Sequence, residues 1–266
     1  MYKILVKLYN RFIEDEVPAL SAQLSYSLIF AFFPFLIFLL TLAGYTPLTS
    51  EGVLNDLALI LPESTYDLVI EIARDIVKKR SGTLLSFSML GTLWASSNGL
   101  SALLRAFNRA YNHRESRPFF LVKALTLVYT IGLALVILII FSFIIFGEII
   151  GRYLFEAAGY SDYFIKIWDI ARYVISLFSI LMVIFLLYYI LPNKKMKFSE
   201  IVPGSIFATV AWISISLGFS FYVNNFTSYS TTYGSIGGVI VLLLWLYWSS
   251  VILIMGAELN AVLASS

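Results

Sequence analysis

The last third of the chain holds the feature that most restricts its fold. Between Glu200 and Glu258 the sequence has 57 consecutive residues without a Lys, Arg, Asp, Glu or His. One crossing of a bilayer takes about 20 apolar residues, so this stretch is long enough for two crossings. Its apolar runs, 201–223 and 236–256, flank an uncharged polar segment at 224–234. The pattern predicts a helical hairpin in lipid, with Glu258 as the first charge after it.

The composition of the whole chain agrees with a membrane protein. Of the 266 residues, 60% are hydrophobic and 13% are charged, whereas a soluble domain carries about 25% charged residues. Closed barrels also satisfy their backbone in lipid, but they need alternating segments of about ten residues, and the runs here are continuous. The expected fold class is therefore an all-α integral membrane protein, with residues 1–266 in one membrane domain.

Hydrophobic runs predict six transmembrane helices. They lie at about 19–44, 84–104, 124–147, 171–191, 201–223 and 236–256. Two other segments are amphipathic instead of uniformly apolar. Residues 1–13 are expected to form a short helix that lies on an anionic membrane surface or packs on the bundle. Residues 51–80 are expected to form an amphipathic, non-spanning segment between the first and second spans.

The distribution of Lys and Arg predicts the orientation, because these residues gather on the cytoplasmic side of membrane proteins. With the N-terminus inside, eleven of the 18 basic residues lie in cytoplasmic segments and seven lie outside. A basic cluster at 78–80 runs against this bias. We expect both termini in the cytoplasm and the segment 224–234 on the outer side.

A polar stripe follows one side of the second predicted span. Steps of three and four residues join its members, which are Asn98, Ser101, Arg105, Asn108 and Asn112. Leu103 and Phe107 are among the apolar residues on the other side of the same helix. A polar stripe at membrane depth is expected to face protein or water, not lipid. It is either a wall that lines a substrate path or hydrogen-bonding glue between helices.

The fifth predicted span carries a second stripe of small polar residues. Its members, joined by steps of four, seven and four, are Ser205, Thr209, Ser216 and Ser220. They either line a path or pack against other helices. Gly218, together with Ser214, is expected to permit close helix approach, as are Gly234, Gly237 and Gly238 at the start of the sixth span.

The motifs of common catalytic sites are absent from the sequence. It contains no GxxxxGK[ST] phosphate loop, no HExxH and no GxSxG turn. Its single histidine, His113, lies in a basic loop, and carboxylates are never paired within a span. We therefore predict no catalytic residues, no metal and no cofactor. The net charge of +2 is too small to indicate a nucleic-acid partner.

Several short stretches of the chain resemble one bacterial family. They are Leu93–Ser97, Asn108–Tyr111, Arg117–Phe119, Pro203–Gly204, Trp212, Phe219, Tyr222–Val223, Tyr233–Ser235, Leu244–Tyr247 and Gly256–Asn260. In this order, over residues 16–263, the chain resembles the YihY/BrkB family of inner-membrane proteins. The resemblance implies six transmembrane helices in the bacterial cytoplasmic membrane. Members have carried the label ribonuclease BN, and relatives have been linked to resistance to serum killing and to moving lipids or lipopolysaccharide precursors.

Two functional hypotheses follow. The first is a transporter or flippase-like protein for an amphiphilic lipid or envelope precursor, because polar stripes could line a path for a head group. Its phosphate would be attracted by Arg105, Arg109 and Arg117. The second is a membrane scaffold or envelope-assembly factor, for which the stripes are only glue. Nothing in the residues supports a ribonuclease. The expected partners are membrane lipids, with further copies or an envelope protein, and no nucleic acid.

The charged residues at the ends of spans two and six suggest an ion pair. Arg105 and Glu258 lie just past the apolar parts of these spans, on the same predicted side of the membrane. A guanidinium binds a carboxylate through two parallel hydrogen bonds. We therefore expect Glu258 to pair with Arg105, or with Arg109 one turn further. The alternative is a solvated carboxylate that marks the end of the helix.

Overall fold

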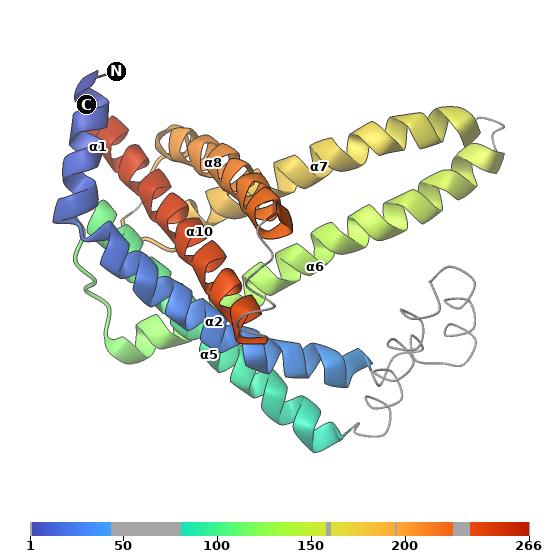
Figure 1. The fold of residues 1–266 in the computed structure, drawn as a ribbon, viewed down its shortest axis with the longest axis horizontal. Coiled ribbons are helices and arrows are strands. Elements are labelled where there is room, and N and C mark those ends of the chain that lie inside the picture. Colours follow the sequence, from blue (N-terminus) through green and yellow to red (C-terminus); the bar gives the residue numbers. More distant parts are fainter. Residues whose placement is uncertain (1, 44–80, 158–160, 195, 226–234, 266) are drawn as a thin grey trace. The chain divides into compact units, whose positions relative to one another are not determined.

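The computed structural model describes residues 2–43, 81–157, 161–194, 196–225 and 235–265. Within these ranges the chain is helical and has no strand (Figure 1). The helices are α1 (Tyr2–Glu14), α2 (Val17–Ala43), α5 (Gly82–Ala110), α6 (Phe119–Ala157), α7 (Ser161–Ile190), α8 (Phe198–Asn225) and α10 (Ser235–Ala264). The predicted all-α class is confirmed. The amphipathic segment at 51–80 and the hairpin tip at 226–234 lie outside the described residues.

Five helical segments are long and apolar enough to cross a membrane. They are Val17–Phe35, Phe119–Ile140, Ile170–Ile190, Phe198–Tyr222 and Gly237–Ala264. α5, which contains the predicted second span, has 29 residues but is less apolar and is not among the five. Its polar stripe accounts for this difference. The protein is an all-α membrane protein, and the sixth crossing stays a prediction.

The chain divides into two compact units, Met1–Tyr26 with Leu100–Ser266, and Ser27–Gly99. The second unit contains the later part of α2 and the first part of α5. A Cβ added at Gly99 would lie 3.3 Å from the side chain of Leu28, and one at Gly91 would lie 3.5 Å from Pro34. Pro34 therefore lies inside α2, next to a glycine of α5.

The larger unit is built around α10. This helix packs along α8, α7 contacts both α6 and α8, and α1 lies against α10 (Figure 1). A cluster of Val17, Ala106, Val251 and Ile254 joins the start of α2, the end of α5 and the second half of α10. Burying such side chains contributes about 25 cal/mol per Å² of apolar surface that is removed from water. The packing is thus concentrated at the end of the unit that contains Glu258.

α8 and α10 approach each other most closely at two glycines. A Cβ added at Gly204 would collide with the carbonyl oxygen of Gly256. One added at Gly256 would collide with the hydroxyl of Tyr188 from α7. The backbone N–H of Gly204 donates to Oδ1 of Asn260 at 2.6 Å, which ties the two helices together. Only residues without a side chain allow this contact.

The close approach of α8 and α10 does not occur at Gly218 or Gly238, two of the glycines at which the sequence predicted it. A Cβ added at Gly218 or Gly238 would meet no atom within 4 Å. The expectation that these two residues permit close helix contact is therefore wrong. A small residue allows such a contact but does not create it, and here the two helices meet nearer the other end of α8.

α5 ends in a residue with left-handed backbone. Asn112 has a φ of 52°. Its N–H donates to the carbonyl of Arg109, and the N–H of His113 donates to the carbonyl of Asn108. These two hydrogen bonds are those of the Schellman motif, in which asparagine is accepted in place of glycine. The motif turns the chain sharply, so that Glu115 returns to the side of α5.

Candidate functional site

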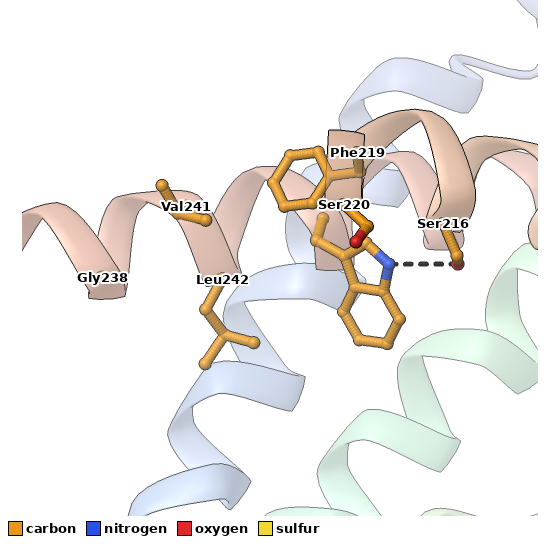
Figure 2. Close-up of a pocket in the computed structure, with 7 residues that line it drawn as sticks. Ser216, Phe219, Ser220, Gly238, Val241 and Leu242 are labelled. Atoms are coloured by element: carbon orange, nitrogen blue, oxygen red, sulfur yellow. Dashed lines mark hydrogen bonds between the residues drawn. The ribbon is translucent and has the colours of Figure 1, made fainter. Parts of the chain in front are cut away.

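A groove opens between α8 and α10 (Figure 2). It has a volume of about 390 Å³. Its lining residues are Ser216, Phe219, Ser220, Gly238, Val241, Leu242 and Trp245. The wall is mostly apolar, with two hydroxyls and an indole N–H as polar groups. Gly238 contributes room, because no side chain fills the space beside it.

Two tryptophans hold the walls of the groove in place. Nε1–H of Trp245 on α10 donates to Oγ of Ser216 on α8 at 3.2 Å (Figure 2). In the opposite direction, Nε1–H of Trp212 on α8 donates to Oγ of Ser249 on α10 at 3.1 Å. The centroids of the two indole rings are 5.8 Å apart. Trp245 therefore contacts the polar stripe of α8.

The predicted stripe on α8 divides into two parts. Ser216 and Ser220 line the groove. Ser205 and Thr209 are buried, and their hydroxyls donate to carbonyls of their own helix, those of Ile201 and Ser205, at 2.9 and 2.8 Å. These last two hydroxyls are therefore satisfied within α8. Whether Ser216 and Ser220 meet a substrate stays a prediction.

The predicted stripe on α5 does not face inward along its whole length. Asn98 and Arg105 are exposed, whereas Asn108 is buried. Ser101 is half-buried, and its hydroxyl donates to that of Thr126 on α6 at 3.2 Å. Leu103 and the other apolar residues of the opposite side fill the core. Asn98 and Arg105 therefore lie on an exposed side of α5, while the apolar side makes the interhelical contacts. That the exposed side faces water stays a prediction.

Asn108 and Arg117 belong to a polar cluster in the α5–α6 loop. Nδ2 of Asn108 donates to Oε2 of Glu115 at 2.9 Å, and Oδ1 of Asn108 accepts the backbone N–H of Asn193. Arg117 binds both oxygens of Glu115 through Nε and Nη2, each at 2.7 Å. These hydrogen bonds lower the pKa of Glu115 to about 2 and raise the pKa of Arg117. Asn108 and Arg117 thus shape the loop.

The depressed pKa of Glu115 predicts a pH-dependent contribution to stability. A carboxyl group has a pKa of about 4.3 in the unfolded chain, so the folded protein holds the ionised form more strongly. The contribution is complete above about pH 5 and is lost as the pH falls toward 2. Thermal unfolding in detergent between pH 6 and pH 3 should therefore be less pH-dependent in Glu115→Gln. Glu14→Gln, at an exposed side chain, should keep the wild-type profile; equal profiles for all three proteins would contradict the assignment.

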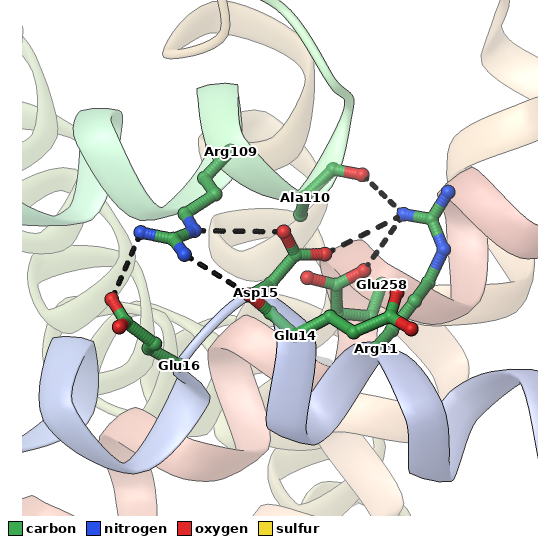
Figure 3. Close-up of polar contacts among 7 residues, drawn as sticks. All are labelled: Arg11, Glu14, Asp15, Glu16, Arg109, Ala110 and Glu258. Carbon is green, nitrogen blue, oxygen red and sulfur yellow. Dashed lines mark hydrogen bonds and ion pairs between the residues drawn. The ribbon is translucent and has the colours of Figure 1, made fainter.

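A charged network joins α1, α5 and α10 (Figure 3). Nη1 of Arg11 lies 3.0 Å from Oε2 of Glu258 and 2.7 Å from the carbonyl oxygen of Ala110. The side chain of Glu258 is fully buried, and that of Arg11 is 20% exposed. Asp15 lies 4.0 Å from the same nitrogen. This network places a buried carboxylate next to a cation from the other end of the chain.

The predicted partner of Glu258 is therefore wrong. Arg109 instead contacts Glu16 at 3.1 Å, Asp15 at 3.5 Å and the carbonyl of Glu14 at 3.0 Å (Figure 3). Glu16, in the turn between α1 and α2, has a φ of 52°, a conformation that is uncommon for a residue other than glycine. Arg105, one turn before Arg109 on α5, is exposed and forms no ion pair with Glu258. α1 supplies the cation because it packs directly on α10.

The sequence pattern does not reveal Arg11 as the partner of Glu258, because Lys3, Lys7 and Arg11 recur every four residues and so read as the charged side of an amphipathic helix. In the structure, the side of α1 that is less exposed consists of Ile4, Leu8, Arg11, Phe12 and Asp15. These positions follow the helical spacing of four, three, one and three residues. An arginine and an aspartate four apart within this apolar row were the available signal for a buried partner.

Three buried polar atoms near this network have no hydrogen-bond partner within the described residues. They are Oε1 of Glu258, the hydroxyl of Tyr111 and Nδ2 of Asn260. Burial raises the pKa of Tyr111, which therefore stays a neutral phenol. The same part of the chain contains no group of three or more potential metal ligands. The cluster is polar, but its residue types are not those of a metal site.

Comparisons with known proteins identify the family. The family model described as Virulence factor BrkB matches residues 8–266. The ribonuclease-like protein YfkH of Bacillus subtilis is 41% identical over 259 residues, which cover 97% of this chain and 94% of YfkH. A UPF0761 membrane protein of Pseudoalteromonas translucida is 23% identical over 274 residues, covering 95% and 83% of the two chains. No solved structure matches. These matches confirm the resemblance found in the sequence: the chain belongs to the BrkB family of membrane proteins.

Proposed function

We propose that the protein is a transporter or flippase-like protein for an amphiphilic lipid or envelope precursor in the bacterial cytoplasmic membrane. The groove between α8 and α10 is the observation that supports this proposal best. Its volume of about 390 Å³ falls within the range of about 300–1,000 Å³ found for small-molecule sites. An amphiphile matches its lining, because an acyl chain contacts Val241 and Leu242 while a polar group reaches the hydroxyls of Ser216 and Ser220.

The proposal includes an orientation and a source of energy. Both termini lie in the cytoplasm and six helices cross the membrane, in keeping with the distribution of Lys and Arg. The sequence holds no nucleotide-binding loop and no catalytic motif. The protein therefore acts without chemistry of its own, and transport is passive, coupled to an ion or driven by a partner. Its partners are lipids together with a second copy or an envelope protein.

Reconstitution into liposomes with fluorescent lipids tests this proposal. We expect the wild-type protein to speed the movement of at least one lipid between leaflets. Gly238→Leu, which places a side chain in the groove, should slow it by about tenfold, equivalent to about 1.4 kcal/mol of barrier. Gly218→Leu is the matched control, because this residue is exposed on α8 and does not line the groove.

The alternative is a scaffold or assembly factor that moves no lipid. The hydroxyls of Ser205 and Thr209 favour this alternative, because they donate hydrogen bonds to carbonyls of their own helix. This is the behaviour of residues that pack between helices. A folded wild-type protein that moves none of several lipid head groups would overturn the transporter and leave the scaffold. If Gly238→Leu were as active as wild type, the groove would lie outside the path.

A further inference from the structure

The three arginines expected to attract a phosphate have different surroundings. Arg109 is bound by the acidic corner between α1 and α2, and Arg117 is bound by Glu115 through both carboxylate oxygens. Arg105 is exposed, and it forms no hydrogen bond or ion pair with any residue that the structure describes. Of these three, Arg105 is the one whose guanidinium is available to a ligand.

Arg105 has a second cation beside it. The hydrogen bond between Ser101 and Thr126 joins α5 and α6 at 3.2 Å. Arg105 follows Ser101 by one turn, and Lys123 precedes Thr126 by one turn, with the hydroxyl of Thr126 donating to the Lys123 carbonyl. The two basic residues therefore lie at the same level of the neighbouring helices, and their charges are close enough to interact.

The surroundings of this pair favour an anion. Two cations at neighbouring positions repel each other, so a negative ligand between them relieves the repulsion. α6 begins at Phe119, so the positive end of its helix dipole lies at the same end. The hydroxyls of Ser101 and Thr126 continue the polar surface one turn along both helices.

We propose that Arg105 and Lys123 form a binding site for a phosphate group. The guanidinium donates two parallel hydrogen bonds to phosphate oxygens, and the ammonium supplies a second, point-like positive charge. The role of this site in a lipid path rests on the proposed function. The binding of a phosphate group to the site is measured without transport. The phosphate belongs either to a lipid head group or to a soluble phosphate ester, and the experiment separates these sources.

Lipid binding to the full chain in nanodiscs tests the site. Phosphatidylglycerol is titrated into nanodiscs of phosphatidylcholine, and protein-bound lipid is counted by native mass spectrometry. We expect one saturable phosphatidylglycerol site. Arg105→Gln and Lys123→Gln should each weaken it by about tenfold, equivalent to about 1.4 kcal/mol. Arg105→Lys should retain part of the affinity, because it keeps the charge but loses the two parallel bonds.

The control is Arg114→Gln, which removes an exposed arginine from the nearby loop. Unchanged binding by this variant supports a specific site, whereas an equal loss with Arg114→Gln would show unspecific attraction to charge and overturn the proposal. Wild-type affinity in a folded Arg105→Gln would also overturn it. Competition by glycerol phosphate assigns the site to a soluble phosphate, and lack of competition assigns it to a lipid. Binding without lipid movement would contradict the proposed function and leave this site intact.

Discussion

Replacing Arg11 with glutamine is expected to lower the free energy of unfolding by about 3–5 kcal/mol, the cost of breaking a buried ion pair by removing one partner. The variant leaves the Glu258 carboxylate, which is fully buried, without the cation at 3.0 Å. Asp15, close to the same guanidinium, loses the same neighbour. Unfolding of the detergent-solubilised protein by heat or denaturant measures the loss.

A double-mutant cycle separates this pair from other effects of the substitution. Glu258→Gln alone leaves Arg11 without its carboxylate, whereas the double variant leaves two neutral amides side by side. We expect the double variant to lose less than the sum of the single variants, with an interaction energy of about 0.5–3 kcal/mol. Arg114→Gln, at an exposed position, should change stability by no more than about 0.5 kcal/mol. Strictly additive losses would show that the two charges do not stabilise each other.

The next largest effect is expected from a single methyl group at Gly204. In Gly204→Ala the new Cβ meets the carbonyl oxygen of Gly256 and the side chain of Asn260. The carbonyl belongs to a helix backbone and cannot turn aside, so α8 and α10 must move apart. Overpacking of this kind costs about 1–3 kcal/mol and occasionally more. The same unfolding measurement detects it, together with loss of the 2.6 Å hydrogen bond from the Gly204 N–H.

Gly218→Ala is the matched control on the same helix. A Cβ there meets no atom within 4 Å. Because glycine in a helix is less favourable than alanine by about 0.5–1 kcal/mol, this variant should be neutral or slightly stabilised. Equal destabilisation by both substitutions would mean that α8 tolerates no side chain anywhere, and the contact at Gly204 would not be special.

The helices themselves were predictable, but the sides on which they meet were not. In water, an apolar side of a helix turns toward the protein, whereas in a membrane both lipid and protein are apolar. The polar and apolar sides of α5 were separated correctly, yet Arg105 lies on the exposed side and Leu104 fills the core. Hydrophobicity therefore predicted the five segments that are apolar enough to span a membrane, but it could not identify the partner of Glu258.

The groove is a second feature that the sequence of one helix could not predict. Ser205, Thr209, Ser216 and Ser220 share one stripe by spacing, yet two of them are packed and two line an open groove. The difference comes from α10, which touches α8 at Gly256 and leaves space beside Gly238. No pattern within α8 records where its neighbour comes close. The lining of the groove thus depends on the glycines of a second helix.

The ion pair of Arg11 and Glu258 also sets the earliest time during synthesis at which α1 can bind α10 through these two residues. The two residues are separated by 247 positions in the chain. At about 5–20 residues per second, the ribosome reaches Glu258 roughly 12–50 s after Arg11. During this interval the first helix has no final partner, because the carboxylate that binds its arginine has not been made. α1 can therefore complete its contacts only after α10 has been synthesised, whereas its hydrogen bond to the Ala110 carbonyl of α5 can form earlier.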